Sequence, residues 1–216
     1  MAYSPTKGRL AIAYRVSNTI YFAHSTDGIT WTSVNTGFSA TQDNLGRVFW
    51  CKDAWYIVSI SSNLIIRSTN ETSWVSITGL SGTPIAIATD GTQFLLVMSS
   101  GTIYRSTDGV SFTALVGVTN PPVMLNWHSA WEYMPGVGWF SMSNGFNPKT
   151  SPTGLVWTTQ TGPGPMTTFT WVKYSYVLGA LVWLTPNTGA IKTSLDGATW
   201  TDRASMRANL GRLGVR

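Results

Sequence analysis

The seven-residue stretch STDGITW, residues 25–31, returns in four further versions along the chain. They read STNETSW at 68–74, STDGVSF at 106–112, SPTGLVW at 151–157 and SLDGATW at 194–200. We call each copy a box and number the copies 1 to 5. The first residue is always serine, the seventh is always aromatic, and the intervals between the serines are 43, 38, 45 and 43 residues. A repeat of this period indicates a protein built from five similar units.

A second marker keeps step with the boxes. A small residue in an expected turn precedes each box serine by 14 to 17 residues, and these residues are Gly8, Ala54, Gly91, Gly136 and Gly179. Short runs rich in β-branched and aromatic residues lie around both markers, and Gly, Asn and Pro separate them. Four such strands in about 43 residues are typical of one β-propeller blade. The sequence therefore predicts an all-β, five-bladed β-propeller with four-stranded antiparallel blades, in one domain over residues 1–216.

The two chain ends together supply one further period. The residues that follow Ser194 and those up to Ser25 amount to 47, and the segment NLGR occurs at both 44–47 and 209–212. We therefore expect the ring to be closed by pairing of the N- and C-terminal segments, with residues 209–216 beside a strand at residues 10–14. Such closure would leave no open edge strand.

The composition is poor in charge and slightly basic. Charged residues make up 11% of the chain, there are 11 Trp and 21 Gly, and the net charge is +5. A basic surface favours acidic partners, but no compact Lys/Arg run indicates nucleic-acid binding. The last fourteen residues hold four arginines, which form either a docking segment or a solvated chain end; they are Arg203, Arg207, Arg212 and Arg216.

Several classes of protein are not expected. Cys51 is the only cysteine, which excludes an intrachain disulfide and a thiolate metal cluster. His24 and His128 show no metal-ligand spacing, so we predict no metal and no cofactor. The first residues do not read as a signal peptide. No apolar run approaches the length of about 18 residues that a membrane span needs, so we expect no membrane insertion.

The side chains of the boxes are suited to fixing a turn. The carboxylate of Asp27, Asp108 or Asp196 can accept hydrogen bonds from backbone amides, and a following glycine permits positive φ. The aromatic residue then packs between neighbouring sheets. The residues assigned to this role are Ser25, Asp27, Gly28, Trp31, Ser68, Asn70, Trp74, Ser106, Asp108, Gly109, Phe112, Ser151, Gly154, Trp157, Ser194, Asp196, Gly197 and Trp200. Boxes 2 and 4 depart from the pattern at Asn70 and Glu71 and at Pro152 and Thr153, which favours a structural device over a repeated binding site.

These boxes resemble the Asp-box, or BNR, repeats of sialidase-like β-propellers. The common form of that motif, Ser-x-Asp-x-Gly-x-Thr-Trp, has one more residue between the aspartate and the tryptophan. The resemblance implies a fold and a turn but no single function, because the motif occurs in enzymes, lectin-like modules and scaffolds alike.

Glycoside hydrolysis by the sialidase-like route needs an arginine cluster, a tyrosine with a glutamate partner, and an acid/base carboxyl group. The chain has nine acidic residues, and most of them fall in boxes or turns. Only Asp43, Glu132 and Asp202 remain, which is a poor supply for paired carboxylates. We therefore predict that the protein is not an enzyme.

The connections between blades carry the candidate ligand-binding residues. Aromatic, amide and charged side chains there can stack on a sugar and hydrogen-bond to it. The candidates are Phe38, Asp43, Arg47, Asn126, Trp127, His128, Trp171 and Lys173. The alternative is that Trp127 and Trp171 begin inner strands and pack between blades.

The short boxes, the small size and the low-charge composition rich in Ser, Thr, Gly and Trp look like bacteriophage virion proteins, in particular tail or head appendages. This resemblance implies a protein made in the host cytoplasm and located in the virion. Its expected function is to bind a host-surface receptor or glycan, with other virion proteins as further partners. The alternatives are a structural or decoration protein that joins other subunits, and a sialidase-like hydrolase.

Overall fold

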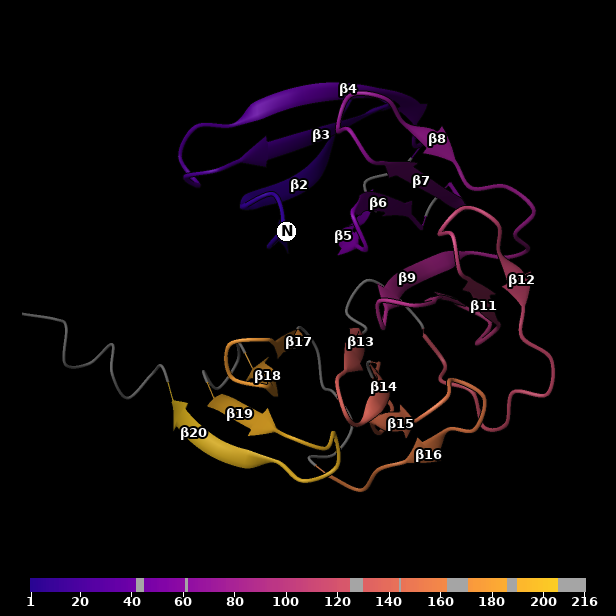
Figure 1. Cartoon of the computed structure of the whole chain (residues 1–216), viewed down its shortest axis with the longest axis vertical. Helices are drawn as coiled ribbons and strands as arrows, with labels where there is room; N and C mark the ends of the chain where they lie inside the picture. Colours follow the sequence, from indigo (N-terminus) through magenta and orange to yellow (C-terminus); the bar gives the residue numbers. More distant parts are fainter. Residues whose placement is uncertain are drawn as a thin grey trace, which may run out of the picture. The chain divides into compact units, whose positions relative to one another are not determined.

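The computed structural model describes residues 1–41, 45–60, 62–124, 130–143, 145–162, 171–185 and 190–205. Within these ranges the chain forms twenty β-strands in five four-stranded antiparallel sheets (Figure 1). In the same ranges no helix is long and apolar enough to cross a membrane. The chain divides into two compact units, Met1–Leu115 (unit 1) and Val116–Arg216 (unit 2).

Unit 1 contains three sheets, which we call blades 1 to 3. Their strands are β1 (Ala2–Ser4), β2 (Arg9–Val16), β3 (Thr19–Ser25) and β4 (Thr32–Ser39); β5 (Leu45–Cys51), β6 (Ala54–Ser59), β7 (Leu64–Ser68) and β8 (Val75–Ser76); and β9 (Pro84–Thr89), β10 (Phe94–Met98), β11 (Ile103–Ser106) and β12 (Thr113–Ala114). In each blade the strands lie side by side in sequence order. The first strands of neighbouring blades contact each other, since β5 lies against β1 and β9.

Unit 2 contains two sheets of the same design, blades 4 and 5. Their strands are β13 (Ala130–Met134), β14 (Gly138–Met142), β15 (Lys149–Ser151) and β16 (Thr158–Thr159); and β17 (Trp171–Ser175), β18 (Ala180–Thr185), β19 (Ala190–Ser194) and β20 (Thr201–Ser205). The prediction of five four-stranded antiparallel blades is confirmed, and the fold is that of a five-bladed β-propeller. Each box connects the third strand of its blade to the fourth.

In blades 2, 3 and 4 the second strand is fully buried. Every residue of β6, AWYIVS, and of β10, FLLVM, is buried. Such continuous apolar runs fit a strand that is covered on both faces, whereas a half-exposed strand would alternate. By contrast, Thr36 is the only one of the eight residues of β4, the outer strand of blade 1, that is buried.

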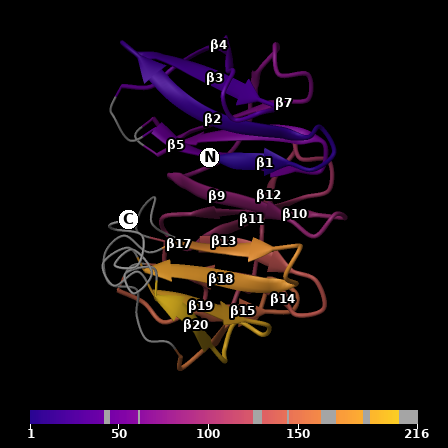
Figure 2. The same ribbon diagram turned by 90° about the vertical axis from the view of Figure 1, so that its left-hand side faces the viewer.

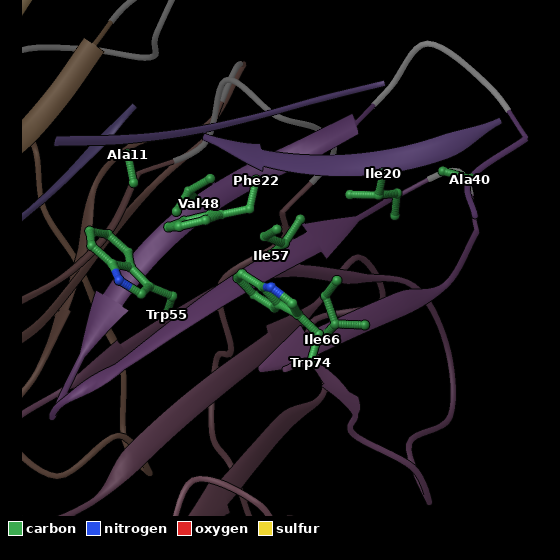
Figure 3. Close-up of a cluster of buried hydrophobic side chains, with 9 residues drawn as sticks. All are labelled: Ala11, Ile20, Phe22, Ala40, Val48, Trp55, Ile57, Ile66 and Trp74. Atoms are coloured by element: carbon green, nitrogen blue, oxygen red, sulfur yellow. The ribbon is translucent and has the colours of Figure 1, made fainter. Parts of the chain in front are cut away.

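Aromatic side chains fill the space between blades 1 and 2 (Figure 3). The Phe22 ring from blade 1 lies 5.4 Å from the Trp55 ring and 5.0 Å from the Trp74 ring of blade 2, measured between centroids. Trp74 is the aromatic residue of box 2, so this side chain packs between sheets as predicted. The buried members of the cluster are Ala11, Ile20, Phe22, Ala40, Val48, Trp55, Ile57, Ile66 and Trp74.

Blades 4 and 5 are joined in the same way. The ring of Trp200, from box 5, lies 6.2 Å from Phe140 of blade 4 and 5.4 Å from Trp183 of its own blade. The buried cluster beside it contains Ala130, Met134, Phe140, Met142, Val172, Leu181 and Trp183. Because each indole or phenyl ring buries a large apolar area, these contacts hold neighbouring sheets together.

The first blade is built from residues 2–39 and the fifth from residues 171–205. The strand beside residues 9–11 is β1, which pairs Ala2 with Ala11 and Ser4 with Arg9. Residues 209–216, which were expected beside residues 10–14, lie outside the described residues. Closure by the C-terminal segment therefore stays a prediction.

Candidate functional site

The turns of boxes 1, 3 and 5 are each held by one serine and one aspartate side chain. In box 1 the Asp27 carboxylate accepts hydrogen bonds from the backbone N–H groups of Ile29 and Thr30, both at 2.8 Å. The Ser25 hydroxyl donates to Asp27 at 2.8 Å and accepts the N–H of Gly28 at 2.9 Å. The Ser25 hydroxyl and three backbone N–H groups that a tight turn would leave unpaired therefore all have acceptors.

Boxes 3 and 5 repeat this network, and it sets the charge state of the carboxylates. Asp108 and Asp196 each accept two backbone N–H groups at 2.7–2.8 Å. The amide of Ile29 holds the pKa of Asp27 far below its usual range, and the amide of Val110 does the same for Asp108. Partial burial opposes ionisation of Asp196, but its amide partners prevail and its pKa is also lowered. Carboxylates of this kind stay ionised and do not serve as general acids near neutral pH.

Boxes 2 and 4 keep the turn without an aspartate. The side-chain oxygen of Asn70 accepts the N–H groups of Thr72 at 3.1 Å and Ser73 at 2.8 Å. In box 4 the hydroxyl of Thr153 accepts one N–H, from Leu155, at 3.3 Å. A neutral acceptor therefore replaces the carboxylate, which indicates that the carboxylate is needed at this position as a hydrogen-bond acceptor.

Box 2 contains one residue that reaches across to blade 1. The fourth residue of the other boxes is glycine, at Gly28, Gly109, Gly154 and Gly197. In box 2 it is Glu71, which keeps the positive φ of 71° that the turn requires. Its side chain is only 5% exposed. A non-glycine residue in this conformation is strained, so its side chain must contribute contacts that offset the strain.

Those contacts form a charged group that we call the Glu71 cluster: Glu71, Lys7, Arg9, His24 and Trp55. The Glu71 carboxylate pairs with Arg9, with Lys7 Nζ at 3.3 Å and with His24 Nε2 at 3.6 Å. The buried indole N–H of Trp55 donates to the same carboxylate at 3.0 Å. The three basic groups come from blade 1, so the cluster ties the box of blade 2 to the neighbouring blade.

The cluster favours an ionised glutamate and a neutral histidine. Burial by itself would raise the pKa of Glu71, but the hydrogen bond from Trp55 and the charges of Lys7 and Arg9 outweigh it, and the pKa is lowered. Burial is also the main cause of the lowered pKa of His24, with Arg9 and Lys7 acting in the same direction and Glu71 opposing them. At neutral pH the cluster therefore holds one carboxylate against two cations.

Two further described acids, Asp90 and Asp202, are also engaged. Asp90 accepts the N–H groups of Thr92 and Gln93 within its own turn, at 2.7 and 2.8 Å. Asp202 pairs with Lys192 at 2.6 Å. Among the residues that the structure describes, no group of three or more His, Cys, Asp and Glu side chains is arranged to hold a metal ion.

Four of the predicted ligand-binding residues lie in strands rather than in the connections between blades. Phe38, in β4, is half-buried and packs against the cluster between blades 1 and 2. Arg47, in β5, is half-buried. Trp171 is the first residue of β17, and Lys173 follows two residues later on the same strand. The other four candidates, Asp43, Asn126, Trp127 and His128, lie outside the described residues.

The difference at Phe38 has a local cause. Gly37 adopts a φ of 77°, and the pairing between β3 and β4 shifts register in this region. The strand therefore continues past the glycine to Ser39 instead of ending before it. The sequence suggested a connection because a glycine followed by Ser, Thr and Asn residues is typical of a loop.

Lys173 of blade 5 forms an ion pair with the neighbouring blade. The Lys173 ammonium lies 2.7 Å from a carboxylate oxygen of Glu132 on β13, and the lysine side chain remains 46% exposed. Phe38 and Arg47 belong to unit 1, whereas Trp171 and Lys173 belong to unit 2.

Sequence reasoning missed the Glu71 cluster, although the sequence held a signal for it. In the sequence alone, Glu71 is a departure of box 2 from the pattern of the other boxes. A glutamate at a position that needs positive φ, where the other boxes have glycine, indicates a side chain with a specific partner. Its partners could not be named, because Lys7 and Arg9 lie more than sixty residues away in the sequence.

Comparisons with known proteins support the fold. No protein-family model matches the chain, and no curated protein matches it in sequence. The solved structure of YCF48 from Cyanidioschyzon merolae is similar, with a TM-score of 0.54 and 16% identity over 89% of this chain and 71% of that chain. A chain of a nidogen/laminin complex gives a TM-score of 0.58 and 14% identity over 90% of this chain and 78% of that one.

A catalytically inactive variant of virginiamycin B lyase from Staphylococcus aureus, solved with quinupristin, gives a TM-score of 0.61 and 11% identity over 93% of this chain and 72% of that chain. These neighbours are β-propeller proteins. At such low identity the likeness defines the class of fold, a β-propeller, and does not extend to function.

Proposed function

We propose that this chain is a non-catalytic β-propeller of a bacteriophage virion, a tail or head appendage that binds a receptor or glycan on the host surface. The observation that carries the non-catalytic part is the engagement of its carboxylates. Described acids with structural partners are Asp27, Glu71, Asp90, Asp108, Glu132, Asp196 and Asp202.

The direction of the pKa shifts supports the same conclusion. Glycoside hydrolysis uses two carboxyl groups, one of which has a raised pKa so that it can donate a proton. Five of the described carboxyl groups have a lowered pKa: Asp27, Glu71, Asp90, Asp108 and Asp196. Backbone amides and neighbouring cations cause the shifts, so these groups are suited to holding turns and blades.

For ligand binding, the described residues with the most suitable chemistry lie on β17. Lys173 offers a half-exposed ammonium, and Trp171 lies two residues before it on the same strand. Aromatic residues and hydrogen-bond donors are common in sites that bind sugars. The assignment to a virion rests on the resemblance of the boxes and of the low-charge composition, with other virion proteins as further partners.

Adsorption of labelled protein to host cells, together with a glycan array, tests the binding proposal. We expect Lys173→Ala and Trp171→Ala to reduce binding at least about tenfold. Lys192→Ala is the matched control, since Lys192 is another ion-paired lysine of blade 5 and should leave binding unchanged. Equal binding by all variants would contradict the site on β17. Turnover of a fluorogenic sialoside by the wild-type chain would contradict the non-catalytic assignment.

A further inference from the structure

One end of unit 2 carries exposed apolar side chains. In every blade the turn between the first two strands and the box lie at the same end, because consecutive strands run in opposite directions; we call this the box end. Exposed large hydrophobic residues gather in the box-end turns of blades 4 and 5, and their exposed fractions range from 37% to 95%. We call them the apolar face: Leu155, Val156, Tyr176, Val177, Leu178 and Leu195.

These residues share one side of unit 2. Ser175 pairs with Ala180 and Leu181 pairs with Ser194, so the turn at residues 176–179 and box 5 lie at the same end of blade 5 (Figure 2). Box 5 in turn lies against blade 4. A Cβ atom on Gly197 would be 2.9 Å from side-chain atoms of Phe140 and Thr150, and Thr150 immediately precedes box 4.

The repeat provides an internal control, because the same turns occur in unit 1. There the six box-end turns contain seven charged residues: Lys7, Asp27, Lys52, Asp53, Glu71, Asp90 and Asp108. In unit 2 the four turns read MPGVG, SPTGLVW, SYVLG and SLDGATW, and Asp196 is their only charge. Since the fold accepts polar turns at these positions, it does not need the apolar residues of unit 2.

The distribution of charge indicates what the apolar face contacts. The sequence of unit 2 contains seven of the fourteen cationic side chains, and none of them falls in its box-end turns. Two copies of a chain with a net charge of +5 repel each other wherever cations meet. A surface without cations allows them to approach, and loss of charge with gain of aromatic and aliphatic residues is the signature of an interface core.

We propose that the apolar face is the contact surface for a second copy of this chain in a symmetric dimer. In a two-fold contact the same surface meets itself, and an apolar surface without cations is complementary to its own copy. The six side chains expose on the order of 700 Å², close to the roughly 800 Å² that each partner contributes to a standard interface. A lipid bilayer suits this face less well, because the Asp196 carboxylate and the peptide groups of the turns would lose water without gaining partners.

Sedimentation velocity of the full chain over about 1 to 100 µM tests the proposal. We expect the wild type to form a dimer, and Val177→Asp or Leu195→Asp to raise the dissociation constant at least about 100-fold, because each places a carboxylate in the contact from both copies. Ile29→Asp is the matched control. Ile29 is an equally exposed apolar residue at the box end of blade 1, in the charged surroundings of unit 1.

Each other outcome would overturn the proposal. A wild-type chain that stays monomeric throughout the range would do so, as would a dimer that Val177→Asp and Leu195→Asp leave intact or that Ile29→Asp dissociates equally. Binding of a monomeric chain to phosphatidylcholine vesicles, lost in Val177→Asp, would assign the face to lipid instead. The melting temperature of each variant should match that of the wild type, since Val177 is 95% exposed and Leu195 is 70% exposed.

Discussion

Replacing Glu71 by glycine separates two explanations of box 2. Glu71→Gly restores the residue that the other boxes have at this position and relieves a positive φ of 71°. Backbone conformation alone therefore predicts that the variant is more stable than the wild type by about 1 kcal/mol. We expect the opposite, because the substitution also removes the carboxylate of the Glu71 cluster.

The magnitude follows from the exposure of the partners. Removing one member of a buried ion pair costs about 3–5 kcal/mol when the partner stays buried. The side chains of Arg9 and Lys7 are 35% and 26% exposed, so water recovers part of this loss, and about 2–3 kcal/mol remains. Subtracting the gain in the backbone leaves a net loss of about 1–2 kcal/mol for Glu71→Gly.

Urea unfolding followed by tryptophan fluorescence measures this difference. Glu71→Gln keeps an acceptor for the Trp55 indole but loses the charge, and should cost about 2 kcal/mol. Ser17→Gly is the control for the backbone, since Ser17 is exposed and has a φ of 54°. It should leave the free energy of unfolding unchanged or slightly raised. A Glu71→Gly variant that is as stable as the wild type, or more stable, would refute the role of the cluster in joining blades 1 and 2.

Three further predictions concern the pH dependence of stability, the glycines of boxes 1 and 3, and the segment at residues 119–121 that precedes blade 4. The pKa values of His24 and Glu71 in the folded protein lie below their ordinary values of 6.5 and 4.5. The free energy of unfolding of the wild type should therefore fall as pH drops below about 6.5, because of His24, and fall further below about 4.5, because of Glu71. Glu71→Gln should lose less stability in the lower range. Gly109→Ala should lower the free energy of unfolding by more than about 2 kcal/mol, because the new Cβ would overlap the Tyr56 hydroxyl. Gly28→Ala should cost only about 1 kcal/mol, because φ is similar there but the new Cβ would lie 3.5 Å from Leu10. Equal losses for the two variants in urea unfolding would contradict this reasoning. The Lys149 ammonium donates to three oxygens of Asn120 and Pro121, in the segment at residues 119–121 that precedes blade 4. Lys149→Met should therefore speed amide hydrogen exchange at Thr119 and Trp157, whose N–H groups pair this segment with box 4. Unchanged protection would show that the lysine does not anchor the segment.

The fold could be predicted because it depends on local signals that recur. A serine followed two residues later by Asp27, Asp108 or Asp196 marks a turn wherever it occurs, and its spacing counts the blades. The position of Trp74 and Trp200 between sheets follows from their size and their fixed place in the box. The turn residues and the aromatic residue of a box lie within seven residues of one another, so both signals can be recognised without knowing the tertiary structure.

The candidate site was harder to predict, because its properties depend on residues far apart in the sequence. The pairing of Lys173 with Glu132, and the packing of Phe38 against the cluster between blades 1 and 2, appear only when the sheets are in place. The sequence does contain a signal for the apolar face. Comparing the turn SYVLG with its counterparts SPTKG and TDGTQ shows that blade 5 has exchanged polar residues for apolar ones.

The proposed function assigns five carboxyl groups of the boxes and turns to holding turns and blades together, with no part in catalysis. NMR titration of the side-chain carboxyl carbons measures the pKa of each group separately. We expect Asp27, Glu71, Asp90, Asp108 and Asp196 all to titrate below the ordinary values for their residue types. A carboxyl group among these five that titrates above about pH 6 would refute the assignment, because such a group is suited to proton transfer at neutral pH.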